Sequence, residues 1–219
     1  MPKNNSTTEN KKLAAALDAL RSDDVMTQNE GVDAAVQIGA AVVPGLLSLL
    51  EEREISRAQV MYALAQIGDS RAAQAFLSGI RDADEHVRAY AAQGLVRLGH
   101  SDAMTASLQT LNDGADPLHL DRTPSVEALG EMGLKAVPLL LDSLMDRNEM
   151  TRLRSQRALE LILSRRHGLR PGKGFPSQAA AERMRAEWQA NGDYDYAANV
   201  QRRGDAVEKW RRWLTNAKE

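Results

Sequence analysis

Apolar residues recur at helical spacing along most of the chain, and each helical stretch stops at a glycine. Four stretches end in an aliphatic residue or methionine followed by Gly39, Gly68, Gly99 or Gly133, at intervals of 29, 31 and 34 residues. Glycine ends a helix readily because it has no Cβ to clash in a left-handed position. A second apolar run follows each glycine. The pattern therefore predicts a helical hairpin that repeats about every 30 residues.

The residues after these glycines carry helix-start signals. The pairs Asp69-Ser70 and Ser101-Asp102 offer N-cap side chains. Pro44 and Pro138 each lie five residues after a glycine, where proline suits a first helical turn. One hairpin cannot bury its own apolar face, whereas stacked neighbours can. We therefore expect an all-α fold without a sheet, in which the hairpins form a right-handed α-solenoid.

Two places depart from the regular unit. Residues 31–39 give only a short first helix, which we expect to be preceded by a capping helix over residues 13–20. The pair Thr123-Pro124 is expected to interrupt the first helix of the fourth unit. The predicted segments are a flexible N-terminal tail (1–10), a repeat solenoid (11–164), and a basic loop with C-terminal capping helices (165–219).

The segments that carry the pattern resemble HEAT repeats, in the short bacterial form also called the phycobilisome-lyase type. Residues 86–99 are similar to the valine-arginine, double-alanine and leucine-glycine helix of that family, and residues 68–77 to its glycine-aspartate turn. The resemblance covers residues 31–163. It implies an α-α superhelix that serves as a non-enzymatic scaffold or adaptor for another protein. It also leaves open a phycobilin-lyase-like accessory protein and a HEAT-like nucleic-acid-binding protein.

Charge is distributed unevenly along the 219 residues, although the net charge is only −2. Residues 151–219 hold 15 basic and 8 acidic side chains, whereas residues 1–150 hold 13 and 22. An acidic repeat region favours a partner with a basic or polar segment. It also argues against nucleic acid, in spite of the arginine-rich C-terminal segment and its aromatic residues.

The second helix of each unit offers a surface for such a partner. Aligning these helices with one another brings residues into two columns, which we expect to line the concave face of the solenoid. A plain solvated face is the alternative. The first column is Ser48, Ser78, Gln109 and Asp142, and the second is Glu51, Arg81, Asn112 and Met145.

All three tryptophans lie beyond residue 170, in two amphipathic segments. Ser177 is expected to cap a helix that carries Trp188, and a second helix carries Trp210 and Trp213. Because terminal repeats need a cap, we expect these aromatic residues to cover the open face of the last repeat. A docking patch for a partner is the alternative. The segment 191–196 between the helices is expected to be a solvated turn.

Few residues are arranged for catalysis or metal binding. No two of the four histidines have helical ligand spacing, and the chain has no cysteine. The loop from Asp116 through His119 to Asp121 is the best candidate cluster for a metal site, but a solvated turn between repeats is the preferred interpretation. The His-Glu pairs of the related deoxyhypusine hydroxylases are absent, as is a phosphate-binding loop. We therefore expect no enzyme activity and no cofactor.

The sequence also contains no apolar run close to the roughly 20 residues that span a membrane. Residues 1–10 are polar and lack the apolar core of a secretory signal. A cytoplasmic protein fits best, and an exported protein whose signal has been removed is the alternative.

Overall fold

The computed structural model describes residues 4–52 and 55–217, which form helices joined by short turns. These residues contain no strand, only two isolated bridges, one from Asp116 to His119 and one from Arg170 to Gly174. The chain divides into two compact units between Ala106 and Ser107. The predicted all-α architecture is confirmed.

In the described part of the chain, six α-helices lie wholly within the first unit, and a seventh crosses into the second unit. Their bounds are α1 (Asn4–Leu20), α2 (Val25–Ile38), α3 (Val43–Leu49), α4 (Arg57–Ile67), α5 (Ala73–Gly79), α6 (Glu85–Arg97) and α7 (Ala103–Gln109). The second unit continues with α8 (Pro124–Met132), α9 (Val137–Ser143), α10 (Glu149–Arg166), α11 (Gln178–Ala190) and α12 (Val200–Ala217).

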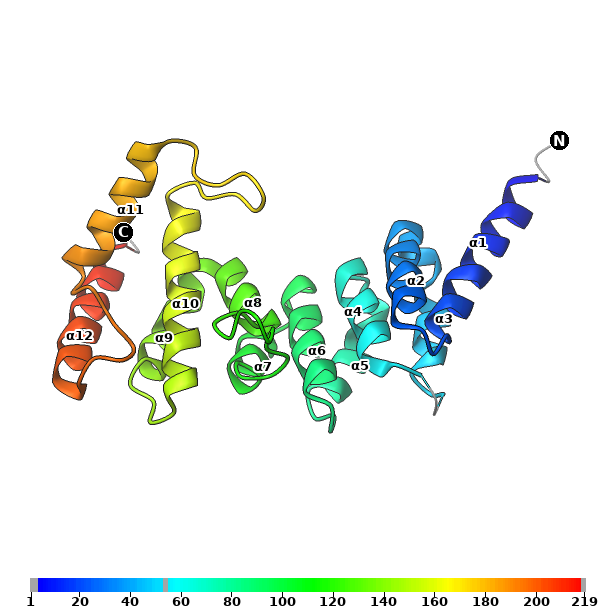
Figure 1. Ribbon diagram of the computed structural model, residues 1–219, viewed down its shortest axis with the longest axis horizontal. Helices are drawn as coiled ribbons and strands as arrows, with labels where there is room; N and C mark the ends of the chain where they lie inside the picture. Colours follow the sequence, from blue (N-terminus) through cyan, green and yellow to red (C-terminus); the bar gives the residue numbers. More distant parts are fainter. Residues whose placement is uncertain (1–3, 53–54, 218–219) are drawn as a thin grey trace. The chain divides into compact units, whose positions relative to one another are not determined.

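Helical hairpins stack on one another within the first unit. The first helices α2, α4 and α6 lie side by side (Figure 1), and the second helices α3 and α5 pack against the first helices that follow them. Arg71 donates to the carbonyl of Ala40 at 2.5 Å, and Arg97 donates to the carbonyl of Gln66 at 2.9 Å. Both hydrogen bonds join residues 31 apart, so each hairpin is tied to its predecessor.

The four glycines that end the first helices have the positive φ that the sequence predicts. Their φ values are 71° at Gly39, 67° at Gly68, 64° at Gly99 and 64° at Gly133. Gly39 and Gly133 share a ψ near −140°, at −139° and −142°, and each begins a short 3-10 turn. A proline then occupies the first turn of α3 and of α9. The same backbone turn therefore occurs once in each unit.

Three helix starts differ from the prediction. Helix α1 begins at Asn4, inside the segment 1–10 that we expected to be a tail, and residues 1–3 lie outside the described part. Helix α2 begins at Val25, because the Asp24 carboxylate accepts a hydrogen bond from the backbone of Thr27 at 2.8 Å. Thr123 does not interrupt α8. Its hydroxyl caps the helix at the backbone N–H of Val126.

The second unit has one hydrophobic core, to which α8 to α12 all contribute. Trp210 of α12 is fully buried there, beside leucines from α9 and α10. The C-terminal helices thus share a core with the last repeats. The division of the chain accordingly falls inside the predicted segment 11–164, and not near residue 165.

Candidate protein-interaction surfaces

In the first unit, the predicted column residues lie on the exposed side of the second helices. Ser48 on α3 and Ser78 on α5 are exposed, as are Glu51 and Arg81 in the turns that follow. The opposite sides of α3 and α5 are buried by apolar residues that include Leu46 and Phe76. The four polar side chains therefore occupy equivalent solvent-facing positions one repeat apart.

In the second unit, the column is partly covered by α12. Gln109 and Asp142 are both exposed, but a carboxylate oxygen of Asp142 lies 2.9 Å from the guanidinium of Arg211. Helix α12 packs against α9 at this place. Asp142 therefore already has a partner within the chain. In this respect it differs from a column residue that is available to another protein.

Two further members of the predicted second column serve the fold. The side-chain amide of Asn112 donates to the hydroxyl of Thr151 at 2.9 Å, and its oxygen accepts from Arg154 at 2.7 Å. Met145 is half-buried and packs against the core of the second unit. These partners are distant in sequence, so an alignment of repeats could not reveal them.

The three tryptophans form one cluster inside the second unit. The ring centroids of Trp188 and Trp210 lie 5.3 Å apart, and those of Trp210 and Trp213 lie 5.0 Å apart. Trp210 is fully buried and Trp188 is 9% exposed, whereas Trp213 is half-buried. A partner could therefore reach only part of Trp213 without opening the core.

Polar side chains surround the edge of this cluster. The indole N–H of Trp213 donates to Glu187 at 2.6 Å, and the other oxygen of Glu187 lies 2.5 Å from Nε2 of His167. The guanidinium of Arg166 lies over the Trp213 ring, 5.6 Å from its centroid. No sequence pattern pointed to His167 and Glu187, which join the end of α10 to α11 and α12. Their separation of 20 residues gave no local signal.

The loop that holds His119 is a closed turn. The Asp116 carboxylate accepts hydrogen bonds from the backbone of Leu118 and pairs with the His119 ring, each at 2.8 Å. These bonds, that of the His119 ring above all, lower the pKa of Asp116. Asp121 instead faces Arg157, at 3.4 Å. Within the described ranges 4–52 and 55–217, no group of three metal-ligating side chains occurs.

Much of the arginine-rich segment is used inside the second unit. Arg152 and Arg154 are only 8% and 5% exposed, and their guanidinium groups donate to backbone carbonyls of Tyr196 and Leu120. Arg165 pairs with Glu127 at 3.2 Å. These arginines are bound to groups of the same chain, so the positive surface is smaller than the sequence suggests.

Comparison with known proteins agrees with this architecture. The family model for HEAT repeats matches residues 42–123 and, in a second overlapping match, residues 73–160. The two matches together span more than half of the chain, which therefore belongs to the HEAT-repeat family. Proteins of this class stack helical hairpins and commonly serve as scaffolds for protein interaction, generally without catalysis. The match does not single out the phycobilisome-lyase type.

No curated protein matches the chain. In the part of the chain that the structure describes, no helix combines the length and the apolar character needed to cross a membrane.

Proposed function

We propose that the protein is a non-enzymatic adaptor that binds a partner protein along the second-helix face of its repeats. The observation that carries this proposal is the repetition of exposed polar positions, Ser48 with Ser78 and Glu51 with Arg81, one repeat apart. Repeat proteins gain affinity by adding modest contacts over such a face. Among the residues that the structure describes, this face has no exposed aromatic anchor, so an extended polar segment fits it better than an apolar helix.

The charge of the repeat region supports a partner segment with basic residues. Residues 1–150 hold 22 acidic and 13 basic side chains. Several of the acidic groups are already paired, such as Asp69 with Arg71 and Glu52 with Arg21. The excess that remains attracts a positive segment and accelerates its approach at low salt.

We also propose that α11 and α12 act as the C-terminal cap of the repeats. The burial of Trp188 and Trp210 in the core of the second unit supports this role. The phenol of Tyr194 supports it as well, because it donates to the carbonyl of Leu144 at the end of α9. Deletion of residues 171–219 should expose this core and cause aggregation. A truncated protein as soluble and stable as the full chain would refute the cap.

The test of the adaptor function begins with a partner isolated from native lysate at two salt concentrations. This step separates a protein partner from nucleic acid or a coloured ligand. Glu51→Lys should then slow association and weaken its salt dependence, at a cost of about 0.2–1 kcal/mol if the ion pair is exposed. The matched control is Asp33→Lys, which makes the same charge change at an exposed position on the first helix α2.

Two results would contradict the adaptor function. One is an equal effect of Glu51→Lys and Asp33→Lys, because the second-helix face would then have no special role. The other is turnover of a small molecule that is abolished by His119→Ala. In that case the loop at residues 116–121 would be an active site.

A further inference from the structure

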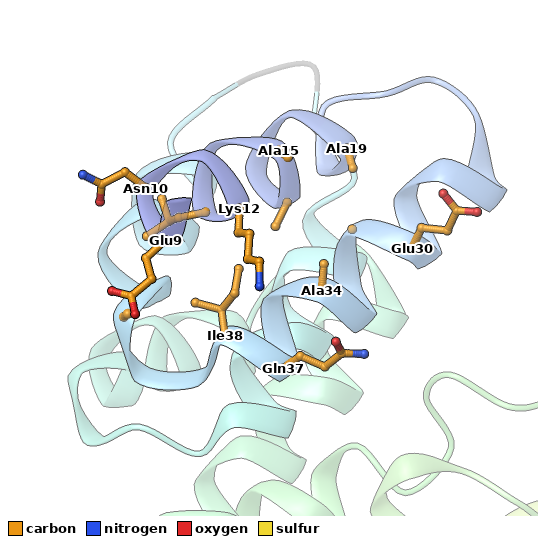
Figure 2. A pocket seen from close by; sticks show the side chains of 13 residues that line it. Glu9, Asn10, Lys12, Ala15, Ala19, Glu30, Ala34, Gln37 and Ile38 are labelled. Carbon is orange, nitrogen blue, oxygen red and sulfur yellow. The ribbon is translucent and has the colours of Figure 1, made fainter. Parts of the chain in front are cut away.

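Helices α1 and α2 leave a groove of about 820 Å³ between them, shown in Figure 2. Small or apolar residues of both helices, with Ala41 from the 3-10 turn after α2, form its floor, and polar residues surround it. The side chain of Lys12 extends from α1 toward Ile38 of α2. The floor is Leu13, Ala15, Ala16, Ala19, Gly31, Ala34, Ile38 and Ala41, and the polar residues are Glu9, Asn10, Lys12, Glu30 and Gln37.

The groove exists because the two helices touch at one end and diverge at the other. At Gly31, an added Cβ would lie 3.0 Å from the Cβ of Ala19 and 3.0 Å from the backbone nitrogen of Leu20. This close approach fixes the C-terminal end of α1 against the middle of α2. From there the groove extends between the helices toward Glu9 of α1 and Ile38 of α2.

The repeat pattern shows what kind of element fits there. Glu30 of α2 occupies the position of Gln59 in α4 and of Tyr90 in α6, counted from the glycines that end these helices. Gln59 donates to Asn29 of α2 at 3.1 Å, and the Tyr90 ring lies 4.9 Å from Tyr62 of α4. In both cases this position contacts the preceding first helix. In α2 the equivalent residue is Glu30, which lines the groove.

The exposure of side chains on α2 and α4 leads to the same conclusion. Ala63 of α4 is fully buried, whereas the equivalent Ala34 of α2 is half-exposed. Gln66 of α4 is half-buried, whereas the equivalent Gln37 is exposed. Helix α1 packs on α2 and α3, as a second helix of a preceding unit would. The groove is therefore the place that a first helix of that unit would fill.

We propose that this groove binds an amphipathic helix of a partner protein, in the place of the preceding first helix. The alanine-rich floor lets a helix backbone approach closely, and it fits a helix face of small apolar residues. Glu9 and Glu30 outnumber Lys12 around the groove, so basic residues beside the apolar face complement it. The inference rests on the protein-binding function proposed above, but it uses none of the second-helix residues.

The test uses the full chain and two synthetic fluorescent peptides of equal length. Both have the same alanine-leucine helical face, with lysines beside it in one peptide and glutamates in the other. We expect the lysine peptide to bind saturably in fluorescence anisotropy. The glutamate peptide should bind at least about fivefold more weakly, because the charges around the groove repel it.

Two substitutions then locate the peptide. Ala34→Trp fills the groove and should weaken binding of the lysine peptide by about tenfold or more, which corresponds to about 1.4 kcal/mol. Ala14→Trp is the matched control, since Ala14 is exposed on α1 but does not line the groove. It should leave binding unchanged. The double variant Glu9→Lys/Glu30→Lys changes only groups on the surface and should reverse the preference between the peptides.

Three results would overturn the proposal. The first is no saturable binding of either peptide, and the second is an equal effect of Ala34→Trp and Ala14→Trp. The third is a dimer in sedimentation that Ala34→Trp makes monomeric, because a second copy would then fill the groove. None of these results affects the second-helix face, which is tested independently by Glu51→Lys.

Discussion

Hydrogen bonds and ion pairs between elements span about one repeat in the first unit, whereas some of those in the second unit span considerably more. In the first unit, Arg21 reaches Glu52 and Arg97 reaches Gln66, each 31 residues away. In the second unit, Tyr194 donates to a carbonyl 50 residues away, and Arg211 pairs with a carboxylate 69 residues away. The first unit is built from contacts between neighbouring hairpins, whereas the second folds its C-terminal helices back over earlier ones.

The two ends of the chain differ accordingly. Helix α1 meets the first unit through small residues, and it leaves the groove described above. Helices α11 and α12 instead place Trp188 and Trp210 in a shared core. The first unit thus has a close contact between small residues beside a groove, whereas the second unit has an aromatic core that its C-terminal helices share with the last repeats.

The largest effect should come from removing the centre of the C-terminal core. Trp210 is fully buried, and its indole nitrogen has no hydrogen-bond partner among the described residues, so it acts through packing. Trp210→Ala should lower the free energy of unfolding by about 3–5 kcal/mol. Chemical denaturation measures this loss. Trp213→Ala, at a half-buried position, should cost less, and equal losses would show that the core is not centred on Trp210.

A smaller effect should come from close packing in the first unit. A Cβ at Gly94 of α6 would lie 2.4 Å from ring atoms of the buried Phe76. Gly94→Ala should therefore destabilise the protein by about 1–3 kcal/mol. At Gly204 of α12 the nearest atom to an added Cβ is 3.9 Å away. Gly204→Ala should stabilise by about 0.4–1 kcal/mol, as expected for a helical glycine with free space. If thermal denaturation shows that both substitutions shift the melting temperature in the same direction, this contrast is wrong.

Tyr194 gives the second unit a dependence on alkaline pH. Burial raises the pKa of Tyr194 to about 12 from an ordinary value of 10.0. Its neutral form therefore stabilises the fold below about pH 10, and this contribution is lost as the pH rises toward 12. Tyr194→Phe removes the hydrogen bond to Leu144, at a cost of about 0.5–1.5 kcal/mol, and should flatten stability between these pH values. If denaturation curves show that the Tyr194→Phe variant loses as much stability at alkaline pH as the original protein, the loss is due to other groups.

The smallest effect should come from the ion pair between α9 and α12. Both side chains are largely exposed, at 68% for Asp142 and 50% for Arg211. Arg211→Ala should cost about 0.2–1 kcal/mol, and the loss should shrink in high salt. Arg212→Ala removes an exposed arginine next to it and is the control. A larger loss that is independent of salt would show that Arg211 contributes through packing.

The sequence was sufficient where the signal is local. The glycine turns, the prolines that follow two of them, and the Ser177 cap of α11 all depend on residues within a few positions of one another. The sequence was insufficient where a side chain has a distant partner. Asn112 was expected to be available to a partner, because Thr151 and Arg154, which bind its side chain, lie 39 and 42 residues further along. Tyr194 appeared to lie in a solvated turn, yet it is 2% exposed.

The one-repeat span of the bonds in the first unit has a mechanical consequence. A hairpin that is tied only to its neighbours can detach without disturbing the rest, as in other repeat proteins. Under tension the first unit should lengthen in successive steps, each releasing about 30 residues or roughly 100 Å of extended chain. The second unit, with bonds that bridge 50 to 69 residues, should resist and then yield in one longer extension. A single chain would thus combine a part that extends gradually under force with a part that resists and then unfolds at once.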